Sequence, residues 1–279
     1  MSEAAEAKSD LGAELFGVRS ILFLPASNPR AIAKARNSAA DLVVMDLEDA
    51  VEPERKASAR DAAIDAAATN WPMRIAIRIN SIGSEWHADD VDAVGQSKAD
   101  FVVIPRAASM EKVRDVAGQT GKPLLAMIET AAGVLAASAI APATKALIAG
   151  TNDLRADLRL PLDATRDPIS ASLQMIVLAA RAAGVAVFDG VFNALDDSEG
   201  FAREATAGRR LGFDGKSLIH PNQIEACHRA FAPSAAEVAR ARSLIDGFRG
   251  GAERFGNEMV ERMHVEAARR VLQRAGELS

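Results

Sequence analysis

Short apolar runs rich in Val, Ile and Leu alternate along this 279-residue chain with longer segments whose apolar residues recur at helical spacing. Runs that are apolar throughout are typical of parallel strands buried on both faces. Eight strand–helix units predict a closed TIM barrel, an α/β fold in which helices surround eight parallel strands. The predicted strands are Ser20–Leu24, Leu42–Asp46, Arg74–Ile79, Phe101–Ile104, Leu124–Ile128, Ala146–Ala149, Ala186–Phe188 and Ser217–Ile219.

An open, doubly wound parallel sheet would use the same alternation, so periodicity alone leaves both architectures open. The loop after the first strand helps to separate them. It reads Pro25-Ala26-Ser27-Asn28-Pro29, whereas the dinucleotide-binding form of the open sheet carries Gly-x-Gly-x-x-Gly at that turn. We therefore favour the barrel.

The barrel is predicted to occupy residues 1–230, because residues 231–279 exceed what one barrel repeat requires. Two helices are predicted in this C-terminal helical extension, Ala235–Phe248 and Glu258–Ala275, on either side of the flexible Gly250-Gly251. We expect the extension to pack on its own barrel, where it could cover the mouth as a lid, or on a neighbouring subunit.

Composition excludes several classes of function. Lys and Arg number 33 against 38 for Asp and Glu, a net charge of −5, whereas binding to nucleic acid favours a basic excess. No apolar run approaches the roughly 18 residues of a membrane span, and the first ten residues lack the apolar core of a secretory signal. The single cysteine, Cys227, allows no internal disulfide. We expect a cytoplasmic protein with a small polar substrate and neither nucleic acid nor membrane as a partner.

Ionisable residues follow several of the predicted strands. In a TIM barrel the C-terminal ends of the strands form the active-site face. Repeated charged residues at those ends indicate chemistry that converges on one mouth. They are the segment Asp46-Leu47-Glu48-Asp49 and the residues Arg78, Arg106, Glu129 and Asp153.

Glu129 and Asp153 follow neighbouring apolar strands, which predicts that their carboxylates lie close together. Two carboxylates with few histidines nearby form a hard-oxygen site, which suits Mg²⁺ with retained waters better than Zn²⁺. The alternative is structural, because Asp153 precedes Leu154-Arg155-Ala156 and could cap a helix there.

Arg78 lies near the end of the third predicted strand, where its guanidinium could hold a carboxylate or thioester oxygen through two hydrogen bonds. It could also form an ion pair with the acidic segment one strand away, and both roles could hold together. Strand alternation sends Asp46 and Glu48 to one side and Asp49 to the other, so the three cannot all face one ligand. At least one of them is expected to orient another group or anchor a loop.

Six blocks of sequence, in order along nearly the whole chain, together resemble one known family. This chain is similar to the citrate lyase β-subunit and malyl-CoA lyase branch of the HpcH/HpaI aldolase–citrate lyase superfamily. The blocks are Arg19-Ser20-Ile21-Leu22-Phe23-Leu24-Pro25, Asp46-Leu47-Glu48-Asp49-Ala50-Val51, Ile77-Arg78-Ile79-Asn80, Ile128-Glu129-Thr130, Gly150-Thr151-Asn152-Asp153-Leu154 and Gly212-Phe213-Asp214-Gly215-Lys216-Ser217-Leu218-Ile219-His220-Pro221.

The resemblance implies a TIM barrel, assembled as a homotrimer or hexamer, that cleaves a carbon–carbon bond of a 3-hydroxy-carboxyacyl thioester of coenzyme A or acyl carrier protein. It implies Mg²⁺, with Mn²⁺ as an alternative metal. Such a cleavage expels an enolate, whose charge a divalent metal and a guanidinium stabilise. The alternatives are a thioesterase or condensing enzyme on the same site, and a citrate lyase β-subunit that is inactive without its carrier protein.

The resemblance also implies roles for individual residues. Glu129 and Asp153 are the implied metal ligands, Arg78 binds substrate and stabilises the oxyanion, and Glu129 contacts substrate and takes part in catalysis. Asp46, Glu48 and Asp49 are an acidic segment that supports the metal's waters and Arg78, with Asp46 and Glu48 catalytic and Asp49 facing substrate. The implied basic contacts are Arg19 for substrate and Arg30, Lys34 and Lys216 for coenzyme A.

The sequence departs from the family pattern in its C-terminal extension. Family lyases carry an aspartate there that reaches a neighbouring subunit's site, and the matching stretch here is Met259-Val260-Glu261. Glutamate extends the carboxylate by one methylene, and a displacement of about 1 Å can cost much of the rate. We therefore predict that the site is reshaped around Glu261 as its acid or that this acid role is lost. From the resemblance, the acyl group is expected to be of the malyl, citramalyl or citryl type.

Overall fold

The computed structural model describes residues 12–277. The chain forms two compact units, with the boundary between Ala230 and Phe231. Within the described range, no helix is both long and apolar enough to cross a lipid bilayer.

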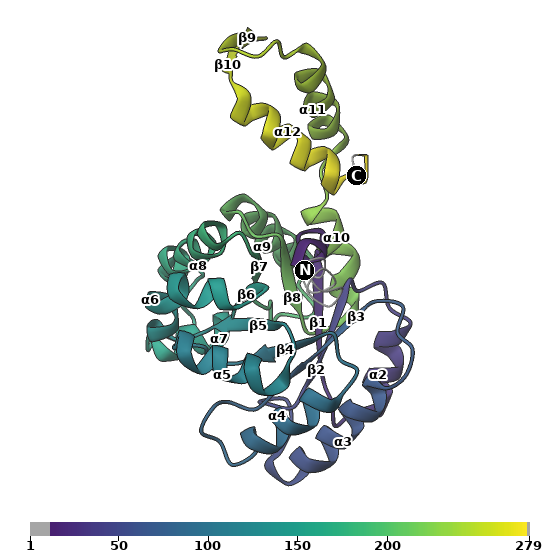
Figure 1. The fold of residues 1–279 in the computed structure, drawn as a ribbon. Helices are drawn as coiled ribbons and strands as arrows, with labels where there is room; N and C mark the ends of the chain where they lie inside the picture. The colour runs from purple at the N-terminus through teal and green to yellow at the C-terminus, as the bar shows by residue number, and fades with distance from the viewer. Residues whose placement is uncertain (1–11, 278–279) are drawn as a thin grey trace. The chain divides into compact units, whose positions relative to one another are not determined.

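In the first unit, eight parallel strands close into a barrel in their order along the chain (Figure 1). Each strand pairs with the next, and β1 closes the ring through its register with β8, in which Ser20 lies opposite Lys216. The predicted TIM barrel is confirmed. Its strands are β1 (Ser20–Pro25), β2 (Leu42–Asp46), β3 (Arg74–Arg78), β4 (Phe101–Ile104), β5 (Leu124–Ile128), β6 (Ala146–Ala149), β7 (Ala186–Asp189) and β8 (Gly215–Leu218).

Helices follow the strands and cover the outside of the barrel (Figure 1). Several begin at a capping side chain: Asn28, Ser109 and Thr130 each accept a hydrogen bond from the backbone N–H three residues later. The α-helices of this unit are α2 (Pro29–Arg36), α3 (Lys56–Ala67), α4 (His87–Gln96), α5 (Met110–Thr120), α6 (Ala131–Ile140), α7 (Thr151–Asp157), α8 (Ser170–Ala183), α9 (Ser198–Leu211) and α10 (Ile224–Phe231). Short 3₁₀ turns lie at η1 (Leu15–Gly17), η2 (Pro53–Arg55), η3 (Ala141–Ala143), η4 (Asp167–Ile169) and η5 (Pro221–Gln223).

Alternate residues of the strands fill the barrel interior, so the barrel is a packed core rather than a channel. Buried members of this core from facing strands are Ile21, Val44, Ala76, Val103, Leu125, Ile148 and Phe188. The C-terminal strand ends, where the charged residues lie, sit on this rigid base.

The eighth strand differs from its prediction. The sequence predicts Ser217–Ile219, whereas β8 runs from Gly215 to Leu218. The charge of Lys216 interrupts the apolar pattern, although this side chain is completely buried. An apolar run therefore identifies a buried strand only when the strand contains no buried, ion-paired side chain.

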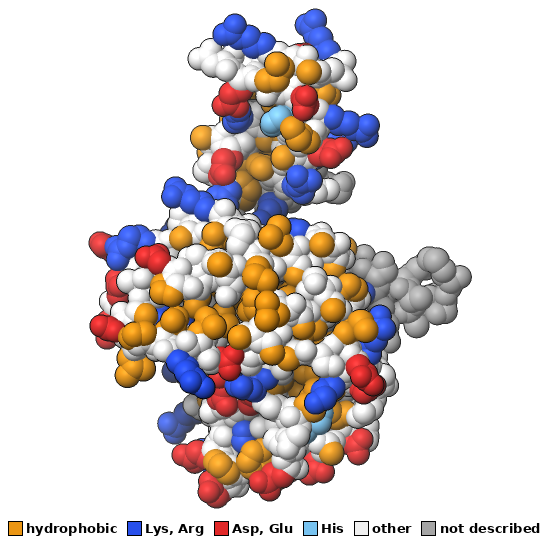
Figure 2. All heavy atoms as spheres, turned by 90° about the vertical axis from the view of Figure 1, so that its left-hand side faces the viewer, with side chains coloured by type: hydrophobic (Ala, Val, Ile, Leu, Met, Phe, Trp, Pro, Cys, Tyr) orange, Lys and Arg blue, Asp and Glu red, His pale blue; other side chains and the backbone are white. Residues whose placement is uncertain are grey.

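Apolar side chains gather on the outer face made by α6 and α8, which pack side by side (Figure 2). Leu135 on α6 is 76% exposed and Leu178 on α8 is 63% exposed, with Met175 on the same helix also exposed. An exposed group of large apolar side chains of this kind is typical of an interaction surface.

The second unit contains α11 (Ala235–Gly247), a two-stranded hairpin of β9 (Glu253–Phe255) and β10 (Glu258–Val260), and α12 (Arg262–Arg274). The predicted second helix, Glu258–Ala275, is wrong at its start, because its first residues pair with β9 in antiparallel fashion. Gly256 adopts the left-handed backbone (φ 58°) in the turn between the strands. Buried Ala241, Leu244, Val260, Val265, Ala268 and Leu272 form a separate small core.

Candidate active site

A pocket of about 380 Å³ opens at the C-terminal ends of the strands, the face predicted to carry the chemistry. Its polar lining includes Asp46, Asp49, Arg78, Glu129 and Asp153. The lining also includes apolar and small residues, among them Phe23, Met127, Ala149, Gly150, Val191, Ser217 and Ile219. The barrel thus brings five of the residues predicted from strand ends around one cavity.

Two carboxylates, those of Asp46 and Glu48, hold Arg78 in place. Its Nε and Nη2 donate to the two oxygens of Asp46, each at 2.6 Å, and its Nη1 lies 3.0 Å from Glu48 Oε2. The guanidinium also lies 5.5 Å from the centre of the Phe23 ring. Burial alone would lower the pKa of Arg78, but the neighbouring Asp46 and Glu48 carboxylates raise it, so the positive charge is fixed.

Asp46 also orders the loop that follows β2. Its Oδ1 accepts a hydrogen bond from the Glu48 N–H at 2.8 Å, and its Oδ2 accepts one from Ala50 at 3.2 Å. These hydrogen bonds commit the Asp46 carboxylate to Arg78 and to the backbone.

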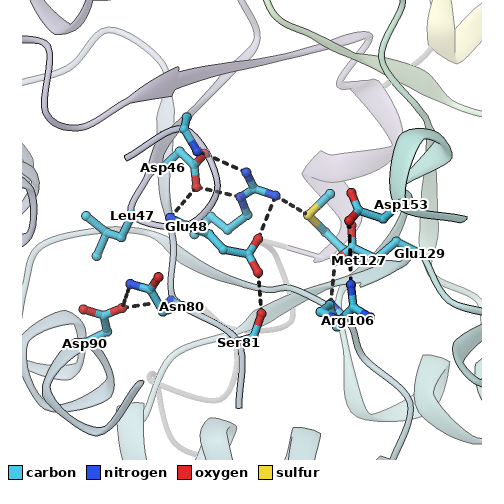
Figure 3. Close-up of polar contacts among 12 residues, drawn as sticks. Asp46, Leu47, Glu48, Asn80, Ser81, Asp90, Arg106, Met127, Glu129 and Asp153 are labelled. Carbon is cyan, nitrogen blue, oxygen red and sulfur yellow. Dashed lines mark hydrogen bonds and ion pairs between the residues drawn. The ribbon is translucent and has the colours of Figure 1, made fainter. Parts of the chain in front are cut away.

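Glu48 is buried beside Arg78 and accepts a hydrogen bond from Ser81 Oγ at its Oε1 (Figure 3). Burial raises its pKa from 4.5 to about 7, although Arg78 opposes the shift. Asp49, by contrast, is exposed and lines the pocket. The expected division of the acidic segment is observed, since Asp46 and Glu48 share Arg78 and Asp49 does not.

Glu129 is nearly completely buried at the end of β5. Its Oε1 accepts a hydrogen bond from the backbone N–H of Arg106 at 2.6 Å, and its Oε2 has no hydrogen-bond partner among residues 12–277. Burial, followed by the charge of Glu48, raises its pKa from 4.5 to about 8. A buried carboxylate oxygen without a hydrogen-bond partner is one that a bound cation or a substrate proton would satisfy.

Two backbone features hold this carboxylate. Arg106 adopts a left-handed backbone (φ 49°), uncommon for a residue other than glycine, and this conformation presents its N–H to Glu129. On the other side lies Gly150, where a Cβ atom would stand 2.3 Å from Glu129 Oε2. Only glycine leaves room for the observed position of Glu129.

Asp153 lies in the first turn of α7 and lines the same pocket. The N-cap position is Gly150, so the alternative role of Asp153 as the helix cap is not observed. Burial, followed by the charge of Asp49, raises its pKa. The Arg106 guanidinium is its nearest cation, with Nη1 at 3.7 Å from Asp153 Oδ1.

The donor set fits a hard divalent cation. Residues 12–277 contain no cluster of three or more His, Cys, Asp or Glu side chains placed to hold a metal. Glu129 and Asp153 offer two carboxylates, and Glu129 Oε2 has no hydrogen-bond partner among the described residues. Mg²⁺ is commonly held by one or two carboxylates with several waters, whereas a structural zinc site needs four protein ligands.

Two predicted contacts are corrected by the structure. Arg19 precedes β1, at the N-terminal end of the barrel, where it pairs with Asp41 rather than lining the pocket. Lys216 is completely buried, with its Nζ bound to Asp189, Glu204 and the carbonyl of Gly190 at 3.2, 2.7 and 2.5 Å. Neither side chain can reach a ligand at the mouth.

The remaining predicted residues lie outside the pocket. Arg30 and Lys34 are exposed on α2, and Arg30 borders a shallow surface depression with Ser27 and Arg55. Glu261 belongs to the second unit, where its backbone N–H donates to His264 Nδ1 at the start of α12.

Sequence reasoning missed the backbone of Arg106 and the side chains of Met127 and Ser217. Met127 Sδ lies 3.6 Å from Arg78 Nη1. Both side chains lie in strands, and the signal that could have found them is the two-residue period that places alternate positions inside the barrel. The conformation of Arg106 has no comparable signal in the sequence.

Comparisons with known proteins identify relatives of this chain. The profile of the HpcH/HpaI aldolase/citrate lyase family matches residues 19–221. The chain belongs to this family. A member named (3S)-malyl-CoA thioesterase, from Cereibacter sphaeroides, is 41% identical over 92% of this chain and 94% of its own length. The citrate lyase subunit beta of Escherichia coli is 33% identical over 92% and 93%.

Among solved structures in the family, CitE from Mycobacterium tuberculosis, in complex with magnesium, acetoacetate and coenzyme A, superposes with a TM-score of 0.83. It is 34% identical and covers 93% of this chain and 98% of its own. The family and the barrel predicted from the sequence are therefore confirmed. Membership makes the chain a citrate lyase β-like protein of an enzyme family, and its own reaction is a separate question.

Proposed function

We propose that this chain is a Mg²⁺-dependent lyase that cleaves a 3-hydroxy-carboxyacyl-CoA thioester of the malyl type into acetyl-CoA and an oxo acid. The observation that carries the proposal is the fixed guanidinium of Arg78 in one pocket with the buried Glu129 carboxylate, whose Oε2 has no partner among the described residues. The malyl group is favoured over citramalyl and citryl because the relatives at 40–41% identity are named for malyl-CoA.

Glu129 and Asp153 would hold the metal, and a solved relative in complex with magnesium and coenzyme A supports the choice of magnesium. When bound there, Mg²⁺, or Mn²⁺ in its place, acts as a Lewis acid toward the hydroxyl and carboxylate oxygens of the substrate. Arg106 keeps Glu129 oriented through its N–H.

Arg78 binds the substrate and stabilises the negative charge that develops on oxygen during cleavage. Asp46 and Glu48 act through Arg78, because both carboxylates contact its guanidinium. Asp49 is the acidic residue of that segment left to face the substrate. Glu261 remains the candidate acid of the C-terminal extension.

The coenzyme A portion is proposed to leave the pocket past β1. Arg30 and Lys34 follow this strand on α2, and Arg55 borders the same surface depression as Arg30. Exposed cations at this edge suit the phosphates of coenzyme A.

Hydrolysis of the thioester is the second candidate reaction, because the same relatives are named thioesterases. We favour carbon–carbon cleavage because a metal held by the Glu129 and Asp153 carboxylates, beside Arg78, would suit binding of the substrate's hydroxyl and carboxylate. These two groups lie at the oxo-acid end of the substrate. Hydrolysis reacts at the thioester carbonyl and needs no such chelation.

A third possibility is a citrate lyase β-type subunit that depends on an acyl carrier protein, and the relatives of that name support it.

We also expect a homo-oligomer, a trimer or hexamer, for which the exposed apolar face of α6 and α8 is a candidate contact (Figure 2). Light scattering after gel filtration measures the assembly, and a monomer at micromolar concentration would contradict this expectation.

The test of the reaction is incubation with malyl-, citramalyl- and citryl-CoA and Mg²⁺, with and without chelator, followed by mass spectrometry. Release of acetyl-CoA and an oxo acid identifies a lyase, whereas coenzyme A and an intact hydroxy acid identify a thioesterase. Glu129→Gln should abolish turnover, and Glu199→Gln, which alters an exposed side chain on α9, is the matched control. Turnover by Glu129→Gln, or turnover unaffected by chelator, would contradict the proposal.

A further inference from the structure

Ser217 carries a hydroxyl that nothing in the described chain satisfies. Its side chain is 2% exposed, it lines the pocket, and its Oγ has no hydrogen-bond partner. A buried hydroxyl without a partner destabilises the folded state, so such a group at a ligand pocket calls for an explanation.

The position of Ser217 in β8 explains why it meets the pocket. Successive residues of a strand face opposite sides of the sheet. Lys216 binds Glu204 of the outer helix α9, so it faces outward. Ser217 therefore faces the barrel interior, and it lines the pocket together with Phe23 and Arg78.

The location of Ser217 selects one end of the proposed substrate. Glu129 follows β5 and Asp153 lies in the first turn of α7 after β6, so the oxo-acid end lies on that side of the barrel. β8 pairs with β1, and β1 lies across the ring from β5. The thioester end of the substrate leads toward the exposed cations of α2. It must then pass the side of the barrel that contains Ser217.

On this basis we infer that Ser217 Oγ donates a hydrogen bond to the thioester carbonyl oxygen of the substrate. The inference rests on the proposed function and adds the residue that recognises the thioester. In carbon–carbon cleavage, the electron pair of the broken bond is delocalised onto this oxygen as the enolate forms. In hydrolysis, addition of water places the same negative charge there. Ser217 forms no covalent bond in either reaction and keeps its proton.

The experiment uses the full chain and three proteins: wild type, Ser217→Ala and the control Ser84→Ala. Ser84 Oγ is also buried without a partner, but Ser84 lies in the loop after β3 and does not line the pocket. We expect Ser217→Ala to lower kcat/KM for the cleaved thioester about 100-fold, as for loss of one oxyanion donor, and Ser84→Ala to leave it unchanged.

Calorimetric titrations separate this role from a structural one. Wild type should bind acetyl-CoA more tightly than coenzyme A, which lacks the carbonyl, and Ser217→Ala should lose that preference. Glyoxylate with Mg²⁺ should bind equally well to both proteins. The thermal midpoint of Ser217→Ala should equal or exceed that of wild type, because an unsatisfied hydroxyl has been removed.

Each contrary result has a distinct meaning. Full activity and an unchanged acetyl-CoA preference in Ser217→Ala would overturn the inference while leaving the proposed function standing. A parallel loss of glyoxylate binding would place the hydroxyl at the oxo-acid end and would also overturn it. If wild type neither cleaves a thioester nor binds acetyl-CoA, the proposed function fails, and the inference fails with it.

Discussion

Glu48→Gln should change how the stability of the barrel depends on pH. The carboxyl of Glu48 is buried beside Arg78, and its pKa is raised from 4.5 to about 7. The folded state therefore binds a proton that the unfolded state has released, so this group's stabilisation is present below pH 4.5 and is lost as pH rises through 7. Gln has the same shape, can still accept from Ser81, and does not titrate.

The magnitude follows from those two values. At 1.36 kcal/mol per pH unit, the full shift from 4.5 to about 7 corresponds to about 3 kcal/mol. Part of the effect lies below pH 5, where the unfolded carboxyl is still becoming ionised, which leaves roughly 2 to 3 kcal/mol between pH 5 and pH 8. The unfolding free energy of Glu48→Gln minus that of wild type should increase by this amount over the interval.

Urea unfolding followed by tryptophan fluorescence measures this difference. Both tryptophans, Trp71 and Trp86, lie in the barrel unit, so the signal reports its unfolding separately from that of the C-terminal unit. Glu199→Gln controls for removal of an exposed carboxylate. A difference between Glu48→Gln and wild type that varies by less than about 1 kcal/mol from pH 5 to 8 would refute the buried, proton-binding carboxyl.

Three further substitutions test other parts of the site. Arg78→Lys keeps the charge but loses the paired hydrogen bonds to Asp46, so kcat/KM should fall about 100-fold or more with little change in circular dichroism; activity near wild type would show that a point charge suffices. Arg106→Gly keeps the N–H on Glu129 and relieves the left-handed backbone, so steady-state turnover should stay within about threefold; a larger loss would implicate the guanidinium. Lys216→Ala removes the cation that pairs with the buried Asp189, so the free energy of unfolding measured in urea should fall by about 3 kcal/mol. An altered KM for coenzyme A thioesters would instead restore the predicted contact with coenzyme A that the burial of Lys216 excludes.

The barrel was predictable because its strands are buried on both faces. Such strands are apolar runs that can be recognised from the local sequence alone. The same rule failed at β8, where Lys216 is buried by pairing with Asp189 and Glu204. It failed again at Glu258–Val260, where a three-residue strand beside α12 has the polarity of an exposed helix turn. The local hydrophobic pattern predicts burial well, but it does not predict which charged side chains form ion pairs with residues elsewhere in the chain.

The candidate site was predictable only in part, for a related reason. Glu129, Asp153 and Arg78 stand at strand ends, and the barrel topology converts that position in sequence into proximity in space. Arg19 was placed wrongly because a block of sequence that contains a site residue also contains residues at the opposite end of the strand. Ser217 was passed over because a hydroxyl becomes informative only when its lack of a partner is known.

The contact between Gly150 and Glu129 offers a way to read other chains of this family. A Cβ at position 150 would also lie 2.4 Å from the Cβ of Glu129, so even alanine would push the carboxylate out of place. A paralogue could therefore retain every charged residue of the pocket and still be silenced by one methyl group on the neighbouring strand end. Annotation by charged motifs alone would count such a chain as active, whereas inspection of this single small residue would identify it as a pseudoenzyme.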